Sequence, residues 1–175
     1  WRPKCIPMDG TTLARTMAAF PGQWASGALL ASPHPLLADV LGIWRHAAGG
    51  RKMAPHNALG PAQLKPVLPD VHIYNVSPEP PRFTVRLTGT RISEYLGTRI
   101  TGRPVEEIAP ERTRRAIVSI LGVIDQTHEP LHLKAPRAVA LPNGDERTLE
   151  SLWLPCCSGD GATLERVVAV SLIGD

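Results

Sequence analysis

Hydrophobic positions repeat at two different spacings along this chain. From Pro35 the apolar residues recur every three or four positions until Gly49 and Gly50, which predicts an amphipathic helix. The same spacing predicts a longer helix over residues 111–127. Shorter helices are expected at residues 11–20, 61–65, 91–96 and 104–108, each bounded by Pro or Gly. These runs supply the helical part of the fold.

The remaining apolar positions alternate with polar ones, which is the spacing of β-strands. The strands are expected at residues 71–76, 82–88, 131–141, 147–155 and 166–173. Turn-forming residues at 77–81, 142–145 and 158–161 link successive strands into hairpins. The element order predicts an α+β fold, with a five-stranded antiparallel sheet, helices over one face and an N-terminal helical extension. An arm over residues 1–34 and one domain over residues 35–175 are expected.

Composition narrows the class of protein. The chain is 43% hydrophobic and 20% charged, which is typical of a globular domain, and no run approaches the ~18 apolar residues of a membrane span. The odd set of Cys5, Cys156 and Cys157 does not form a disulfide framework, which favours a reducing compartment. We therefore expect a cytoplasmic protein without a secretory leader or a membrane partner. The net charge of +3 is scattered and aromatics are only 5% of residues, so a nucleic-acid partner is not expected.

Four phrases carry a resemblance to a known family. They are LGIWRHAAGGRKMAP (41–55), LKPVLPDVHIYNV (64–76), RFTVRLTGTRISEYLGTRITGRPVEEI (82–108) and LESLWLPCCSGDG (149–161). With the strand order, they make residues 35–173 similar to a bacterial subgroup of stand-alone PAS-domain proteins. The chain departs from this pattern at His56, where an arginine is expected, and at Cys156, which follows Pro155 in place of leucine. The resemblance implies a sensory fold whose cavity, between the sheet and a lid at residues 89–102, binds small molecules or cofactors.

Five residues are candidates for lining such a pocket: Tyr74, Arg86, Tyr95, His132 and Trp153. The aromatic rings and His132 lie on expected strands or on the lid, although a core position explains Tyr74 and Trp153 equally well. Arg86 is either part of a solvated strand face or a partner for a carboxylate of a ligand or protein.

The chain shows no preformed metal site, because neither the HExxH nor the CxxC spacing occurs. The cofactor is unknown. If a haem were bound, His72 or His132 would be its axial ligand. Cys156 and Cys157 are more readily explained as structural residues than as a redox pair.

No set of catalytic residues is recognisable. The chain has no GxSxG motif, and the possible general bases Asp70, His72, Glu94 and Glu150 form no evident pair. The leading hypothesis is a non-enzymatic sensory domain that binds a small molecule or another signalling protein and acts through protein association. The alternatives are a small α+β hydrolase or isomerase that uses the same pocket, and a scaffold without a ligand.

A homodimer is also expected. The first long helix carries more apolar residues than one narrow stripe needs, so Leu37, Leu41 and Trp44 are candidates for a dimer interface.

Overall fold

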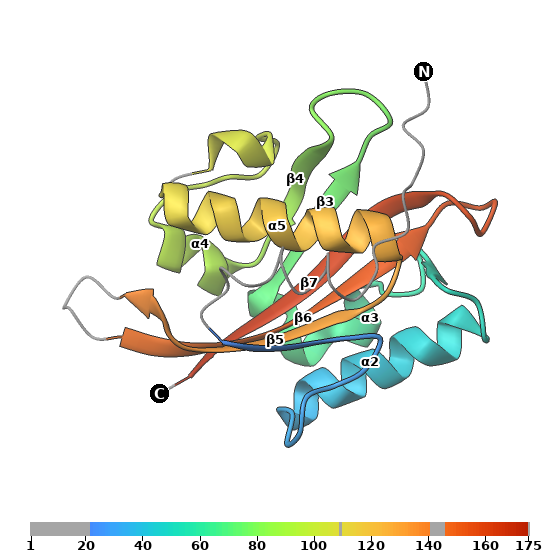
Figure 1. The fold of residues 1–175 in the computed structure, drawn as a ribbon, viewed down its shortest axis with the longest axis horizontal. Coiled ribbons are helices and arrows are strands. Elements are labelled where there is room, and N and C mark those ends of the chain that lie inside the picture. Colours follow the sequence, from blue (N-terminus) through green and yellow to red (C-terminus); the bar gives the residue numbers. More distant parts are fainter. Residues whose placement is uncertain (1–21, 109, 141–145, 175) are drawn as a thin grey trace.

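A seven-stranded β-sheet forms the centre of the molecule (Figure 1). The computed structural model describes residues 22–108, 110–140 and 146–174. The strands are β1 (Gln23–Ser26), β2 (Ala54–Pro55), β3 (Val71–Val76), β4 (Phe83–Thr88), β5 (Leu131–Ala140), β6 (Glu146–Cys157) and β7 (Leu164–Gly174). Their order is β1-β5-β6-β7-β3-β4 with antiparallel neighbours, while β2 joins β6 in parallel. The α+β class and the five predicted antiparallel strands, now β3 to β7, are confirmed.

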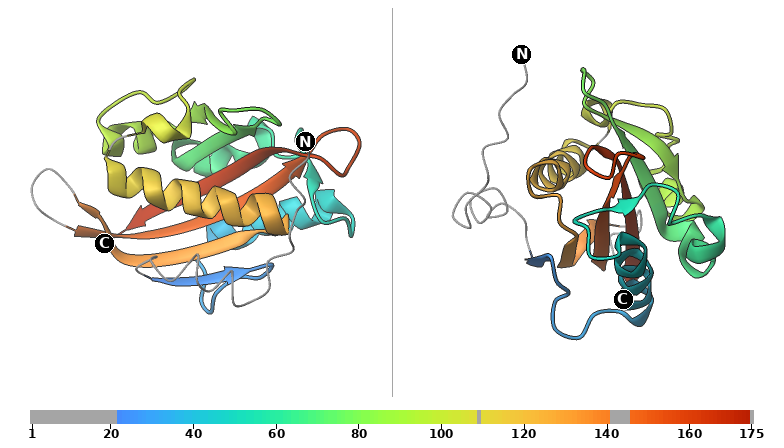
Figure 2. Two further views of the ribbon diagram at one scale, coloured as in Figure 1. Left: turned by 45° about the horizontal axis from the view of Figure 1, so that its top comes forward. Right: turned by 90° about the vertical axis from the view of Figure 1, so that its right-hand side faces the viewer.

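Helices cover both faces of the sheet (Figures 1 and 2). The helical elements are α2 (Pro35–Ala48), α3 (Pro61–Leu64), η1 (Lys65–Asp70), α4 (Thr90–Leu96), η2 (Val105–Glu107) and α5 (Glu111–Thr127). Apolar residues of α5 and η2 pack on one face, and those of α2, α3 and η1 pack on the other. The prediction of helices over one face only is therefore wrong. The reason is that β6 is buried on both sides, because Trp153 faces α5 while Leu152 and Leu154 face α2.

The two long helices begin and end where the sequence predicts. Helix α2 has Pro35 in its first turn and ends at Gly49, which has the left-handed φ of 57°. Helix α5 ends at His128, which has a φ of 56°, and its first turn is tied by the Glu111–Arg115 ion pair. Local capping and apolar spacing thus determine both helices.

The three candidate dimer residues are buried within this chain. Leu37, Leu41 and Trp44 expose 0%, 1% and 4% of their surface and pack against β6 and β7. The Trp44 indole also donates a hydrogen bond of 2.9 Å to the Pro155 carbonyl oxygen. The expectation that these side chains are free for a second subunit is therefore wrong, because the second face of the sheet occupies them. Homodimerisation itself stays a prediction.

Gly89 joins β4 to α4 at a close backbone contact. Its φ of −62° is one that any residue adopts, so backbone angles do not explain the glycine. A Cβ atom at this position would lie 2.3 Å from the Pro69 carbonyl oxygen. The close approach of η1 thus requires glycine here. After this turn Ile100 and Val105 are buried in the same core cluster as the apolar residues of α5, while Tyr95 is half-buried.

Some expectations fall on parts of the chain outside the described residues, namely the helix at 11–20 and the turn at 142–145. Within the predicted arm, β1 pairs with β5, so residues before 35 contribute a strand to the sheet. The domain boundary at residue 34 stays a prediction. Among the described residues, no helix is long and apolar enough to cross a membrane.

Candidate functional site

An aromatic cluster lies buried between the sheet and α5. The rings of Tyr74 on β3 and Trp153 on β6 are stacked, with centroids 5.5 Å apart and planes 13° from parallel. His72 meets both rings edge-on, at 5.5 Å from Tyr74 and 5.0 Å from Trp153. Its Nδ1 is hydrogen-bonded to the Tyr74 hydroxyl at 2.8 Å, and its Nε2 to the Ser171 hydroxyl at 2.7 Å. The Trp153 indole donates to the Ser151 hydroxyl at 3.0 Å. The polar atoms of the cluster therefore satisfy one another.

Burial sets the protonation states in this cluster. Desolvation lowers the pKa of His72 from 6.5 to about 3, and it raises the pKa of Tyr74 above its ordinary value. Both groups are therefore neutral near pH 7. Because both ring nitrogens of His72 are engaged, this histidine has no free atom for a haem iron. The cluster is built as a rigid, satisfied part of the core.

A second polar cluster lies on the opposite face, beside α2. His132 on β5 is fully buried, and its Nδ1 accepts the Leu30 backbone N–H at 2.9 Å. Since Nδ1 is an acceptor, the ring proton sits on Nε2, which donates to Glu150 Oε1 at 3.1 Å. The same Oε1 accepts the His34 backbone N–H at 2.6 Å, and Lys134 pairs with Oε2 at 3.2 Å. His132 thus has both ring nitrogens engaged and is not available as a haem ligand.

The pKa values of this cluster reflect competing effects. Burial lowers the pKa of His132, and it prevails over the hydrogen bond and charge of Glu150, which act to raise it. Burial would raise the pKa of Glu150, but donors from His34, Lys134 and His132 together hold it below its ordinary value. The cluster is therefore a carboxylate beside a neutral imidazole, and it fixes the segment before α2 to the sheet.

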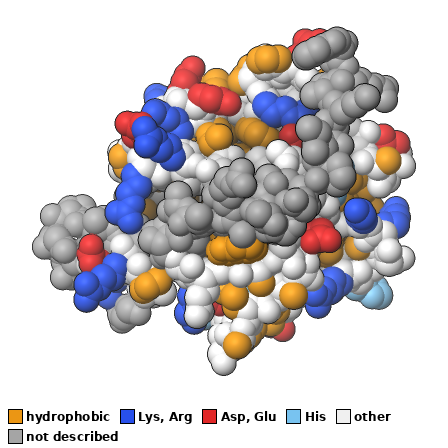
Figure 3. All heavy atoms as spheres, viewed as in Figure 1, with side chains coloured by type: hydrophobic (Ala, Val, Ile, Leu, Met, Phe, Trp, Pro, Cys, Tyr) orange, Lys and Arg blue, Asp and Glu red, His pale blue; other side chains and the backbone are white. Residues whose placement is uncertain are grey.

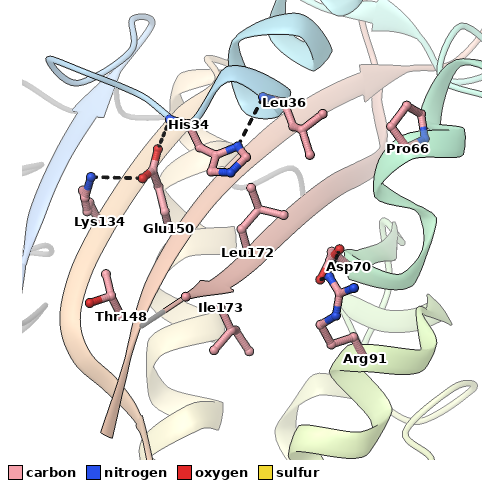
Figure 4. A pocket seen from close by; sticks show the side chains of 11 residues that line it. His34, Leu36, Pro66, Asp70, Arg91, Lys134, Thr148, Glu150, Leu172 and Ile173 are labelled. Atoms are coloured by element: carbon pink, nitrogen blue, oxygen red, sulfur yellow. Dashed lines mark hydrogen bonds and ion pairs between the residues drawn. The ribbon is translucent and has the colours of Figure 1, made fainter.

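A groove of about 540 Å³ opens next to this second cluster (Figure 4). It exists because β7 is longer than β3: the last β3–β7 pair is Val71 with Val170, whereas β7 continues beside β6 to Gly174. The N-terminal end of α2 and the Lys134–Glu150 pair form one wall, η1 and α4 form the other, and Leu172 and Ile173 lie between them. Its lining residues are His34, Leu36, Pro66, Asp70, Arg91, Lys134, Thr148, Glu150, Leu172, Ile173 and Gly174.

The second wall carries its own ion pair. One nitrogen of Arg91, Nη1, donates to both carboxylate oxygens of Asp70, at 2.5 Å for Oδ1. Asp70 is buried at the end of η1, and Arg91 covers it from α4. The groove is therefore enclosed by two ion pairs on opposite sides, with an apolar strip between them.

The structure does not bring the five predicted pocket residues together. Tyr74 and Trp153 share the α5 side, whereas His132 lies on the α2 side and forms the layer behind the groove wall. Arg86 is exposed on the edge strand β4, and Tyr95 is half-buried near the end of α4. Whether any of them contacts a ligand stays a prediction. The groove residues Lys134 and Arg91 are not among the predicted pocket residues, although strand alternation places Lys134 on the same face as His132.

The remaining candidate features are the two cysteines of β6, a metal site and the surface charges. Cys156 and Cys157 are buried free thiols, and burial raises the pKa of Cys156 to about 12, so it is protonated at neutral pH. Within the described part of the chain, no three His, Cys, Asp or Glu side chains could hold a metal ion. On the face shown in Figure 3, basic and acidic side chains lie next to one another.

The family of the chain follows from its sequence. Residues 32–168 match the sequence model of the PAS domain. The chain belongs to the PAS domain family. Domains of this family have a sensory fold that generally serves signalling and ligand binding. No curated protein sequence matches the chain.

Solved structures with a similar fold include several sensory proteins of low identity. An RNA-binding light-oxygen-voltage receptor is 15% identical with a TM-score of 0.44, over 87% of this PAS chain and 38% of the receptor. The blue-light photoreceptor Vivid is 12% identical with a TM-score of 0.44, over 83% of this chain and 99% of Vivid. A sensory box histidine kinase/response regulator from Burkholderia thailandensis is 13% identical with a TM-score of 0.38, over 65% and 84% of the two chains.

Proposed function

We propose that this PAS domain is a non-enzymatic sensory module that binds a small molecule in the groove and transmits its occupancy through α2 to another signalling chain. The proposal depends on Glu150. Its carboxylate lines the groove, and the same carboxylate accepts the backbone N–H of His34, the residue immediately before α2. A ligand that contacts the groove wall therefore acts on the hydrogen bonds that hold the start of this helix.

The hydrogen-bond chain extends this coupling to the preceding segment. Glu150 also accepts from His132, and His132 accepts from the Leu30 backbone. Two backbone N–H groups of one connecting segment thus depend on a single carboxylate–imidazole pair. A ligand shifts a conformational equilibrium only if it binds the two conformations with different affinities. A ligand in the groove therefore needs a physical connection to α2, the helix that would transmit the signal. The link supports sensing at this groove.

The same geometry argues against the enzyme alternative. A general base needs a free lone pair within reach of a substrate. His72 and His132 have both ring nitrogens hydrogen-bonded and are buried, and Glu150 carries three donors. We therefore favour the binding role over the enzyme alternative, and we propose that the output is association with a partner or a second copy of the chain. The cytoplasmic location stays a prediction.

The test combines identification of a ligand with its location. Native mass spectrometry of protein purified from cells, and thermal shift across a metabolite panel, should reveal a bound or stabilising compound. Amide NMR shifts with that compound should then centre on Thr148, Leu172 and Ile173.

A matched pair of variants locates the site independently. Thr148 lines the groove, whereas Thr101 is exposed away from the lining residues. Thr148→Tyr should fill the groove and weaken binding at least about tenfold, a loss of 1.4 kcal/mol, whereas Thr101→Tyr should not. An apo mass with no stabilising compound would favour the ligand-free scaffold. Shifts centred on Tyr74 and Trp153 would place the ligand on the other face of the sheet.

A further inference from the structure

In both ion pairs of the groove, the carboxylate is buried and its basic partner is exposed. The carboxylates are covered, with 3% of the Asp70 side chain and 10% of the Glu150 side chain exposed. Their basic partners are open, with 47% of Arg91 and 39% of Lys134 exposed. Although the charges cancel in each pair, the groove therefore presents mainly its positive ends to a ligand.

The unused hydrogen-bonding atoms of the groove are mostly donors. In the described structure, Arg91 uses only Nη1, which leaves Nε and Nη2, and the Lys134 ammonium makes one bond. His34 accepts the Leu36 backbone N–H at Nδ1, so its proton sits on Nε2 and is free to be donated. By contrast, Glu150 accepts from His34, His132 and Lys134, and both Asp70 oxygens accept from Arg91.

These donors stand on opposite walls. Lys134 and His34 lie on the side of α2, Arg91 lies on the side of α4, and Leu172 and Ile173 separate them (Figure 4). Leu36 and Pro66 add further apolar surface to the lining. A volume of about 540 Å³ is within the usual range for metabolite-sized ligands.

We propose that the groove binds a small organic diacid, with one carboxylate at Arg91, the other at Lys134 and His34, and an apolar middle over Leu172 and Ile173. This inference rests on the proposed sensory function and names its ligand class. Carboxylates accept charge-assisted hydrogen bonds from guanidinium and ammonium groups, which are the stronger kind. A cationic ligand would lack free acceptors here, and a neutral one would leave these donors without charged partners.

The test is a titration with two sets of ligands: diacids that differ in length, and six-carbon ligands that differ in charge. Succinate, adipate and suberate probe the distance between the walls, hexanoate removes one acid, and hexanediol and hexamethylenediamine replace both. Calorimetry and amide NMR on the wild-type chain should show saturable binding of one diacid. Hexanoate should bind at least about tenfold more weakly, because one charged contact is lost. Binding should also weaken as salt is raised.

Variants test each wall. Lys134→Gln removes one cation while Glu150 keeps its two other donors. The double variant Asp70→Asn/Arg91→Gln removes the opposite pair without leaving a buried carboxylate unpaired. Each should weaken diacid binding about tenfold or more. Lys52→Gln is the matched control for Lys134→Gln, since it changes the net charge equally at an exposed position just after α2, outside the lining residues, and it should keep the affinity. The double variant leaves the net charge of the chain unchanged.

The possible failures are distinguishable. The diacid proposal is overturned if hexanoate or hexanediol binds as tightly as the diacids, or if the wall variants bind like the wild type. Binding of the neutral diol in the groove would overturn the ligand class while supporting the sensory groove. The diacid proposal is also overturned if none of the diacids binds the wild-type chain saturably. The proposal that the groove is the ligand site is overturned if the compound that co-purifies or stabilises the chain shifts only amides around Tyr74 and Trp153.

Discussion

The Tyr74 hydroxyl lies 2.8 Å from Nδ1 of His72, and both side chains are buried between the sheet and α5. Because the other His72 nitrogen is bonded to Ser171, polar groups from β3 and β7 satisfy one another inside the core. A buried polar atom that loses its partner destabilises the folded state by about 1–3 kcal/mol. Each member of this chain of hydrogen bonds therefore protects its neighbour from being left unpaired.

Removal of the Tyr74 hydroxyl should expose this dependence. In Tyr74→Phe the ring can still stack on Trp153, but Nδ1 of His72 loses its partner. The free energy of unfolding should fall by about 1–2 kcal/mol, measured by urea denaturation. Tyr95→Phe is the control, because Tyr95 is half-buried and outside this cluster, and it should change stability by less than about 0.5 kcal/mol. Equal losses in the two variants would contradict the role assigned to the hydrogen bond.

The burial of His72 predicts how stability depends on pH. Its pKa is lowered from 6.5 to about 3, so the folded chain keeps the imidazole neutral while the unfolded chain takes up a proton below about 6.5. The unfolded state then binds more protons, and stability falls as the pH drops through this window. The slope from this residue is about 1.4 kcal/mol per pH unit. His132, whose pKa is also lowered, acts in the same direction.

Urea titrations between about pH 7 and pH 5 measure this slope. His72→Gln should reduce it, since glutamine does not titrate, whereas Thr101→Gln, an exposed substitution that involves no titratable group, should leave it unchanged. A His72→Gln variant with the full wild-type slope would show that other groups cause the pH dependence.

The sequence predicts local structure well where the signals are local. The bounds of α5 and β3 match the expected residues because apolar spacing and nearby Pro, Gly and turn residues determine them. The coverage of both faces was missed, because an apolar run such as that of β6 does not reveal which helix covers which side.

The arrangement of the candidate site could not be predicted from the spacing of residue types along the chain. Trp153 pairs with Leu131, and Leu152 pairs with His132, so His132 and Trp153 face opposite sides of the sheet. Only the register between strands establishes this. The groove likewise depends on β7 extending past the start of β3, which is a tertiary feature.

The close approach at Gly89 predicts a costly substitution. In Gly89→Ala the new methyl would meet the backbone oxygens of Pro69 and Leu68, at 2.3 Å and 2.7 Å, and neither can move without displacing η1. Overpacking of this kind destabilises by about 1–3 kcal/mol. Thermal and urea denaturation should both show the loss.

Gly42 offers an internal comparison. It lies exposed within α2, and a Cβ atom there would meet nothing within 4 Å. Gly42→Ala should therefore stabilise the chain by about 0.5–1 kcal/mol through helix propensity. If Gly89→Ala were as stable as Gly42→Ala, the contact between Gly89 and η1 would not constrain the fold.

A substitution at Leu37 distinguishes a role in the core from a contact with a second subunit. The side chain is 0% exposed and packs with residues of β6 and β7, so Leu37→Ala should lower the free energy of unfolding by about 2–5 kcal/mol. Light scattering should give the same molar mass for the variant and the wild type wherever both are folded. Val118→Ala is the control, because Val118 is 38% exposed on α5, and it should cost less than about 1 kcal/mol. If Leu37→Ala instead converted a dimer into a stable monomer, Leu37 would contact the second subunit, as first expected from the sequence. A loss of stability that is independent of protein concentration would assign Leu37 to the core beneath α2.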